Sequence, residues 1–255
     1  MRYIFQLLLI LLPLLVSNQI AKKEIPVALE IPAVKPGEKV TKHLAYSLLF
    51  DKNSHQARWV AYELTEEETK KSFERSDKFT ADPLINCNTS FQADYSKSGY
   101  DRGHLAPAAD MSWCDQAVRE SFYYSNMSPQ LPAFNRGIWK KLETKVREWA
   151  IENKVLYVVT GPVLETGLPC IGPDHISVPK YYYKVLLDYT EPQYKAIGFL
   201  LFNEGSTREL DVFAVAIDSV EKITGLDFFP LLPDSLETQL ESECNFTDWD
   251  NINPS

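Results

Sequence analysis

The chain has 255 residues, 45% of them hydrophobic and 12% aromatic. This composition can bury the core of one domain or of two small ones, and we expect one. The net charge of −9 and the pI of about 5.0 argue against nucleic-acid binding by overall electrostatics, which depends on Lys and Arg neutralising phosphates. Acidic residues dominate residues 209–250, where we expect a solvated surface. A turnover enzyme needs only a local basic groove.

The N-terminus has the pattern of a secretory signal. The first three residues include one arginine and precede an apolar run at residues 4–16, which is too short for a comfortable membrane span. Cleavage near Ser17 or Ala21 assigns residues 1–21 to a signal peptide. This predicts a secreted or periplasmic protein with no stable membrane association after cleavage. An uncleaved anchor is the alternative, because neither site has a clean pair of small residues.

The next segment leads into the folded domain. Residues 22–42 are rich in Pro and Lys and lack an apolar period, which is typical of an extended linker, so the domain is expected at residues 43–255. Two β-rich runs, residues 44–50 and 58–64, are separated by turn-forming residues and predict an antiparallel hairpin. An irregular loop is expected at residues 66–88.

The second half of the chain alternates strands and helices. A mostly antiparallel central sheet is predicted by β-rich runs at residues 155–163, 181–189, 195–202 and 210–215. Residues 135–152 carry apolar side chains at helical spacing. Asp218 with Glu221 resembles a capping box at the start of a short helix that ends near Gly225. The fold class expected is therefore α+β, a central sheet flanked by helices.

The cysteines leave two interpretations open. The chain has four, Cys87, Cys114, Cys170 and Cys244, and in an exported protein they favour disulfide bonds, in any of three pairings. A zinc site is the weaker interpretation, because no Cys-x-x-Cys pair occurs and the four histidines are scattered.

Residues 101–104 read Asp-Arg-Gly-His, a combination suited to phosphate chemistry. A histidine with a near-neutral pKa can deprotonate water, so His104 is a candidate general base. Arg102 can fork onto phosphate oxygens, and Gly103 lets the backbone approach closely. By itself the segment also allows a structural pairing of His104 with Arg102.

A second polar cluster comprises residues 125–130 and the start of the long helix. Asn135 and Glu143 are eight residues apart, so in a regular helix they lie about 12 Å apart along the axis and cannot both ligate one ion directly. If Asn135 gives its amide oxygen to Mg²⁺, Glu143 acts through a bound water. The alternative is that Asn135 caps the helix and Glu143 pairs with Lys140 or Arg147.

In order and spacing, these motifs resemble the DNA/RNA nonspecific endonuclease family, ββα-metal (His-Me finger) nucleases that include secreted bacterial nucleases and mitochondrial endonuclease G. The family's Asp-Arg-Gly-His motif is intact at residues 101–104, its Ser-Asn-x-x-Pro-Gln motif at residues 125–130, and its Asn-x-x-x-Trp-x-x-Leu-Glu helix at residues 135–143. Further landmarks follow at residues 160–162, 175–179 and 184–185. The resemblance covers residues 43–233.

The resemblance implies a role for each motif residue. His104 is expected as the general base, Asn135 as the direct metal ligand and Glu143 as a ligand through water. Arg102 is expected to stabilise the phosphate or the transition state, and Asn126 to support the active site.

Two more arginines complete the expected site. Arg75, in a loop that does not align securely, is expected to bind substrate. Arg136 is expected to do the same, and it stands where the family often has Gln. His175 matches a family position to which we assign no catalytic role.

The resemblance also implies a reaction. We expect hydrolysis of DNA and RNA with Mg²⁺ as the cofactor, Mn²⁺ substituting, and products carrying 5′-phosphate and 3′-hydroxyl ends. Activity is expected to rise as the histidine loses its proton, at about pH 6.5 for an unperturbed imidazole.

Two other classes of protein remain as alternatives. One is an inactive nucleic-acid-binding or inhibitor-like protein, which the acidic pI favours and the intact His104, Asn135 and Glu143 oppose. The other is a different hydrolase, but neither His-Glu-x-x-His nor Gly-x-Ser-x-Gly occurs in the chain.

Overall fold

The computed structural model describes residues 27–86 and 91–250, so the expected signal peptide and Cys87 lie outside the described residues. Its strands are β1 (Val40–Lys42), β2 (Ser47–Asp51), β3 (Gln56–Thr65), β4 (Asp101–His104), β5 (Met127–Gln130), β6 (Val155–Pro162), β7 (Cys170–Ile171), β8 (Ile176–Ser177), β9 (Tyr181–Asp188), β10 (Lys195–Phe202) and β11 (Ala214–Val215). Its α-helices are α1 (Phe91–Tyr95), α2 (Asp115–Ser121), α3 (Lys140–Asn153), α4 (Ile217–Thr224), α5 (Asp234–Ser242) and α6 (Thr247–Asp250). The helices η1 (Tyr124–Asn126) and η3 (Leu210–Phe213) are 3₁₀, and η2 (Phe134–Trp139) is a π-helical turn.

The central sheet has seven strands in the order β1-β2-β3-β6-β9-β10-β11, and every pairing is antiparallel. The β2–β3 pair is the predicted hairpin, and β6, β9 and β10 occupy the predicted β-rich runs. These central strands are buried almost throughout, because layers cover both faces of the sheet and each side chain meets one of them. The expected α+β fold is confirmed.

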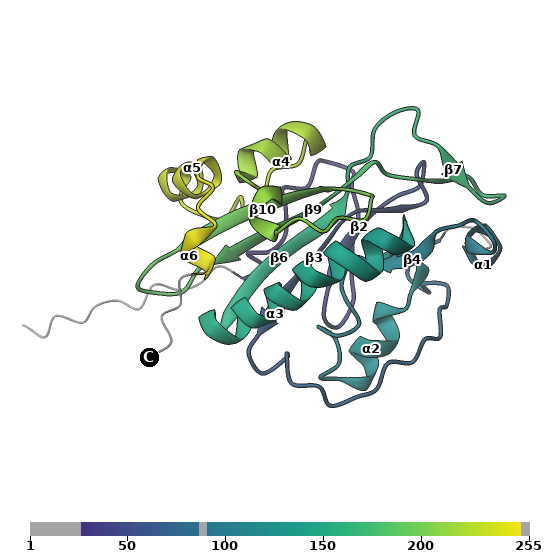
Figure 1. Ribbon diagram of the computed structural model, residues 1–255, viewed down its shortest axis with the longest axis horizontal. Helices are drawn as coiled ribbons and strands as arrows, with labels where there is room; N and C mark the ends of the chain where they lie inside the picture. Colours follow the sequence, from purple (N-terminus) through teal and green to yellow (C-terminus); the bar gives the residue numbers. More distant parts are fainter. Residues whose placement is uncertain (1–26, 87–90, 251–255) are drawn as a thin grey trace, which may run out of the picture.

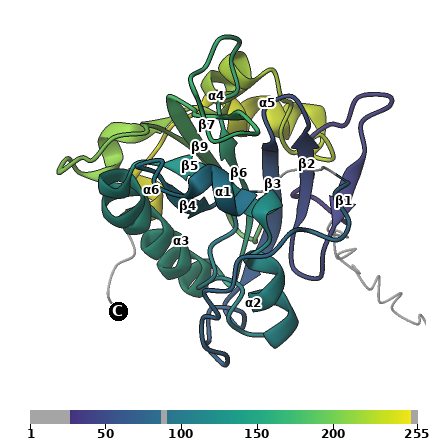
Figure 2. The same cartoon turned by 90° about the vertical axis from the view of Figure 1, so that its right-hand side faces the viewer.

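Each face of the sheet packs against its own helices (Figures 1 and 2). On one face, α3 contributes Leu142, Val146 and Trp149 to a core that includes alternate residues of β3 and β6. On the other, α4 and α5 pack over the opposite side chains of the same strands. The period of two along a strand separates the two cores. The sheet thereby separates the α3 side of the molecule from the side that carries α4 and α5.

Three local predictions are corrected. The expected strand at residues 210–215 is mostly the 3₁₀ helix η3, and only Ala214–Val215 pair with β10. The expected regular helix from residue 135 begins instead as the π-helical turn η2, kinked at Gly137. No capping box forms, because α4 begins after Ala216 without a side-chain cap, and the carboxylate of Glu221 accepts a hydrogen bond from the Phe228 amide at 2.7 Å. Gly225 does end α4, with φ at 65°.

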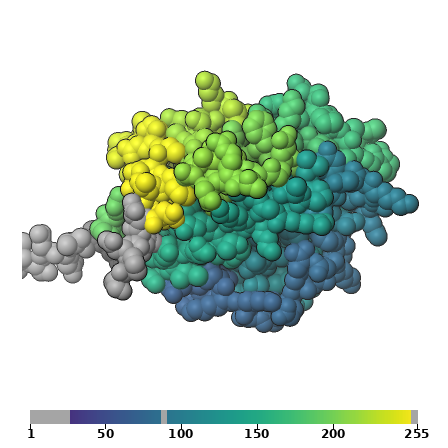
Figure 3. Space-filling view, in the orientation of Figure 1, coloured from purple at the N-terminus to yellow at the C-terminus, as the bar shows by residue number. Residues whose placement is uncertain are grey.

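The two ends of the domain are more closely packed than the sequence suggested. Within the expected linker, Leu29 is fully buried in the core beneath α4 and α5. At the acidic end, the Trp249 ring lies 5.2 Å from that of Trp149 and is 1% exposed. Figure 3 shows these C-terminal residues, in yellow, as part of one continuous surface with the preceding segments. The acidic end is therefore a packed layer of the domain as well as a solvated surface.

The cysteines form no disulfide within the described residues, where Cys114, Cys170 and Cys244 carry free thiols. The Cys170 sulfur lies 3.3 Å from Nδ1 of His175, next to the small β7–β8 ribbon and away from the cleft described below. Among the described helices, none combines the length and the apolar character needed to cross a membrane.

Candidate active site

The Asp-Arg-Gly-His and Ser-Asn-x-x-Pro-Gln motifs form the two strands of one antiparallel ribbon. Strand β4 pairs with β5 in the register His104 to Met127 and Asp101 to Gln130, and the chain then enters η2 and α3. This is the ββα order expected from the sequence. A cleft of about 570 Å³ opens between the ribbon and the helix. Its lining includes six of the seven predicted site residues, Arg75, Arg102, His104, Asn135, Arg136 and Glu143.

His104 ends β4 and lines the cleft while remaining 8% exposed. Its ring packs edge-on against Phe122, with centroids 4.8 Å apart, and its Nε2 atom is buried with no hydrogen-bond partner among the described residues. Burial lowers the pKa of His104 to about 3, and the charge of Arg75 acts in the same direction. The imidazole is therefore neutral at neutral pH, as a general base must be. A general base with this pKa would place the acid limb of activity below the expected pH of about 6.5.

Asn126 does not line the cleft but holds the turn that follows His104. Its amide oxygen accepts a hydrogen bond from the Ala106 amide at 2.9 Å, and its amide nitrogen donates to the carbonyls of Ala106 and Ser121. The side chain is fully buried. These contacts fit the supporting role expected of Asn126 and place it away from any reacting atom.

The glycine of the motif is required by packing across the ribbon. A Cβ atom at Gly103 would lie 2.1 Å from the side-chain oxygen of Gln130. A larger residue would therefore displace the buried Gln130 side chain. The close backbone approach expected at Gly103 is thus to its own partner strand, and it sets the position of both neighbours, Arg102 and His104.

Arg102 lies against three aromatic rings at the edge of the cleft. Its guanidinium carbon is 5.0 Å from the Phe79 ring centroid, 5.7 Å from that of Tyr95 and 6.0 Å from that of Tyr124. These cation–π contacts position the side chain without neutralising it. Its Nε is buried and has no hydrogen-bond partner in the described part of the chain. The guanidinium is suited to receive an anion.

Asn135 is oriented by the first residue of the motif. Its amide nitrogen donates to Asp101 Oδ2 at 2.9 Å, and because a carboxylate can only accept, this contact fixes which side of the amide is nitrogen. The amide oxygen is left as a possible ligand. Arg136 also donates to Asp101, at 2.6 and 2.8 Å. Burial raises the pKa of Asp101, but the hydrogen bonds from Arg136 and Asn135 outweigh it and keep the carboxylate ionised.

Glu143 is half-buried on α3, among charged groups whose closeness the sequence did not predict. Burial raises its pKa, the charge of Lys184 opposes this, and Asp110 adds to it. Arg147, which the sequence offered as a partner of Glu143, pairs instead with Asp110 at 2.7 Å. Lys184 is fully buried and lies 4.9 Å from the Trp139 ring centroid. No sequence pattern marked Asp110, while Lys184 stood out only as a landmark of the family.

The basic groove is supplied by residues from separate elements. Arg75 forms an ion pair with Asp77 and lies 5.1 Å from the Phe122 ring centroid. Arg136 is 71% exposed and stays at the mouth of the cleft. Lys140 and Arg147 also line it. A local positive surface therefore exists in a chain whose net charge is −9.

The oxygen donors of the cleft suit a hard divalent cation. Asn135 presents an amide oxygen and Glu143 a carboxylate, and both line the same cavity. Mg²⁺ is held in proteins by few protein oxygens and keeps several waters. The kink at Gly137 lies within η2, between Asn135 and the start of α3, so the 12 Å spacing expected of one regular helix does not apply. The residues present fit such an ion.

A ββα ribbon and helix that place a neutral histidine, an arginine without an ion-pair partner among the described residues, and an amide oxygen around one cleft define a nuclease-like site. Residues 30–235 match the sequence profile of the family described as DNA/RNA non-specific endonuclease. The chain belongs to this family.

Curated relatives and a solved structure agree with this membership. The chain is 34% identical over 202 residues to the mitochondrial nuclease EXOG of Danio rerio, covering 72% of this chain and 59% of that protein. It is 32% identical over 201 residues to the mitochondrial endonuclease G of Homo sapiens, covering 73% of this chain and 68% of that protein. A solved EndoG/EndoGI complex contains a chain that superposes with a TM-score of 0.73 at 31% identity, covering 80% of this chain and 89% of that one.

Proposed function

We propose that this protein is an endonuclease that hydrolyses phosphodiester bonds of DNA and RNA with little sequence preference. The observation that carries the proposal is the convergence of His104, Arg102, Asn135 and Glu143 on one cleft. A site that contacts phosphate and leaves the base edges alone accepts either nucleic acid. The matched part of the chain spans 59% of the zebrafish relative, so the activity of this chain is inferred from its own residues.

The chain's residues divide the work between them. His104 takes a proton from the attacking water, since its ring is neutral and the residue lines the cleft beside Arg102 and Asn135. Arg102 binds the phosphate and stabilises charge that develops on it. Arg75 and Arg136 hold the neighbouring backbone at the rim. The water oxygen bonds to phosphorus and the bond between phosphorus and O3′ breaks, which leaves 5′-phosphate and 3′-hydroxyl ends.

The cofactor proposed is Mg²⁺, with Mn²⁺ as a substitute because both favour octahedral oxygen coordination. When bound, such an ion polarises the phosphate and stabilises the leaving oxygen. Asn135 would hold it directly, with Asp101 orienting the amide, and Glu143 would hold it through water. The cysteines are not proposed as ligands, because Mg²⁺ prefers oxygen ligands and no cysteine in the described part of the chain lines the cleft.

Export of the protein is proposed on the sequence alone. The apolar run at residues 4–16 with an arginine before it favours a signal peptide, and the mature protein would act in the periplasm or outside the cell.

Plasmid degradation with and without EDTA tests the function. We expect supercoiled DNA and a structured RNA to be degraded in Mg²⁺ and spared in EDTA, with end-labelling showing 5′-phosphates. Binding without cleavage would indicate the inactive nucleic-acid-binding protein instead. Cleavage that persists in EDTA would contradict the proposed metal dependence but would still support the nuclease activity.

A further inference from the structure

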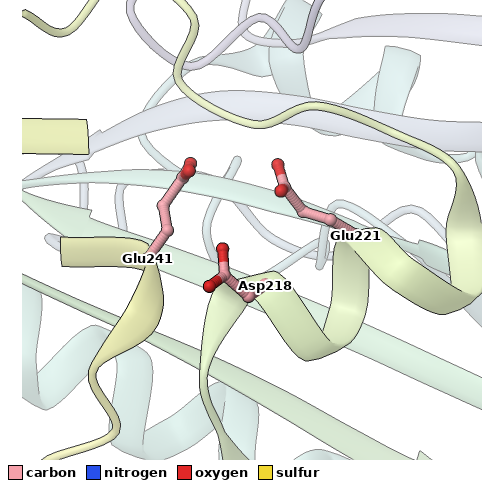
Figure 4. A group of neighbouring side chains, drawn as sticks. All are labelled: Asp218, Glu221 and Glu241. Carbon is pink, nitrogen blue, oxygen red and sulfur yellow. The ribbon is translucent and has the colours of Figure 1, made fainter. Parts of the chain in front are cut away.

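Three carboxylates meet between α4 and α5, on the face of the sheet opposite the cleft. Asp218 and Glu221 lie on α4 and Glu241 lies in the last turn of α5. One oxygen from each is within 4.8 Å of the others. Figure 4 shows the carboxylates of Glu221 and Glu241 reaching into the same space, with Asp218 beside them. The residues are far apart in sequence and are brought together by the packing of α4 on α5.

Glu241, the most buried of the three, has a carboxylate oxygen that lacks a hydrogen-bond partner in the described part of the chain. Its side chain is 6% exposed, and its Oε1 atom is buried without a hydrogen-bond partner among the described residues. A buried carboxylate oxygen without a partner carries a desolvation penalty that folding does not repay. One oxygen each of Asp218 and Glu221 lies within 4.8 Å of a Glu241 oxygen, and these two carboxylates offer only acceptors when ionised. A positive group located among the three would satisfy all of them.

The surroundings add negative charge. The carboxylates of Glu221, Glu237, Asp227 and Asp218 all lie close enough to Glu241 to act on it electrostatically. Glu241 also lies at the C-terminal end of α5, where the helix dipole contributes partial negative charge and no basic residue occupies the last turn. Lys222, on α4, is exposed and is not among the largest influences on Glu241. The field at this point therefore favours a cation.

We propose that Asp218, Glu221 and Glu241 form a binding site for one Ca²⁺ ion. Oxygen ligands of Ca²⁺ lie about 2.3–2.6 Å from the ion, so two of them can be up to about 5 Å apart, which the cluster satisfies. Mg²⁺ needs shorter distances and binds through fewer carboxylates. A set with only carboxylate oxygens also disfavours Zn²⁺, which is commonly bound by His or Cys. The site goes beyond the proposed nuclease function and does not depend on it.

The ion would act as a structural clamp. Glu221 already accepts a hydrogen bond from the Phe228 amide at 2.7 Å, so a ligand set that includes Glu221 links α4, the segment that follows it, and α5. Phe228 and Phe229 are fully buried in the core beneath these helices. Binding is thus expected to stabilise this layer while leaving the cleft on the other face unchanged.

Thermal unfolding in Ca²⁺ and in EGTA, with excess Mg²⁺ throughout, tests the proposal. At about 100 times Kd, Ca²⁺ should raise the Tm of the wild type by about 5–10 °C. Asp218→Asn should lose this rise and retain nuclease activity, and calorimetric titration should show one fewer Ca²⁺ ion per chain. Asp218 is exposed, so this variant should fold even if Glu241→Gln does not.

Glu243→Gln is the matched control, because it removes an exposed carboxylate two residues from Glu241 without touching the cluster. It should keep the full Tm rise, as should Asn135→Ala, which changes only the cleft. An equal Ca²⁺ response in wild type and Asp218→Asn would overturn the site. In a separate series without background Mg²⁺, a Tm rise on adding Mg²⁺ alone as large as that on adding Ca²⁺ alone, and lost in Asp218→Asn, would overturn the assignment to Ca²⁺.

Discussion

On the cleft side of the sheet, charged side chains lie beside groups of opposite sign or beside aromatic rings. Asp110 pairs with Arg147 at 2.7 Å, and Glu143 lies in the field of the buried Lys184. On the other side, between α4 and α5, three carboxylates share one space, and one oxygen of Glu241 has no partner among the described residues.

Buried charges therefore have different roles in the cleft and between α4 and α5. In the cleft, cations and anions hold one another in place, so a water, a phosphate and a metal can be bound in defined positions. Between α4 and α5 the protein supplies only one sign and needs an ion from outside. Variants of the first region should change catalysis with little effect on Ca²⁺-dependent stability, and variants of the second should do the reverse.

Asn135→Ala should have the largest effect. It removes the only direct protein ligand proposed for the catalytic metal, so cleavage at ordinary Mg²⁺ concentrations should fall below detection. Circular dichroism and Tm should stay close to wild type, because the Asn135 side chain contacts only Asp101 in the described hydrogen-bond network. Asn53→Ala, at an exposed hairpin turn, is the control. A folded, active Asn135→Ala would exclude the single-ligand arrangement.

His104→Ala should lose on the order of 10²–10⁴ in kcat, which is the usual contribution of a general base. Metal affinity and the Ca²⁺ response should be unaffected. His175→Asn serves as the control, since His175 is exposed and has φ at 56°, a conformation that Asn tolerates. Wild-type kcat in the folded His104 variant would remove this residue from the mechanism.

Glu143→Gln should cost less, about 10–100-fold in activity or metal affinity, because its proposed contact with the metal is through water. The loss should be partly recovered by raising Mg²⁺. Glu148→Gln, further along α3 and more exposed, should be neutral. If Glu143→Gln is as inactive as Asn135→Ala at every Mg²⁺ concentration, Glu143 is itself a direct ligand, and the two residues are not ranked as proposed.

The smallest expected effect is on stability against pH. The pKa of His104 is lowered to about 3 in the fold and is about 6.5 when unfolded, so the unfolded chain binds more protons between these values and stability falls as the pH drops through that window. Between pH 7 and pH 5 this linkage is about 2 kcal/mol. Urea unfolding of wild type and His104→Gln at both pH values measures it. From pH 7 to pH 5, the unfolding free energy of the variant should fall by about 2 kcal/mol less than that of the wild type. Equal decreases would mean that the fold does not lower the pKa of His104.

The sequence predicted the sheet well because its strands have long apolar runs. Residues 195–202 became β10 with the expected bounds, and six of the seven predicted site residues line one cleft. These predictions were local, since periodicity or a contiguous motif carried each of them.

The rest depended on contacts between distant segments. Asp110 and Lys184 reach Glu143 only through the tertiary fold, and of the two only Lys184 had been marked, as a landmark of the family. The expected capping role of Asp218 with Glu221 was wrong because tertiary contacts gave Glu221 another donor, the Phe228 amide. The acidic C-terminal segment was expected to be solvated because its acidic residues far outnumber its one basic residue, Lys222, yet Trp249 anchors it in the core.

The kink at Gly137 divides the helix that carries both proposed metal-binding side chains. Asn135 lies before it and Glu143 after it, so their separation depends on the angle of one joint as well as on the rise of the helix. A protein engineer could therefore retune which ion radius the cleft accepts by editing residues 136–138, keeping both ligands intact. In an ordinary α-helix the same adjustment would require moving a ligand by a whole turn.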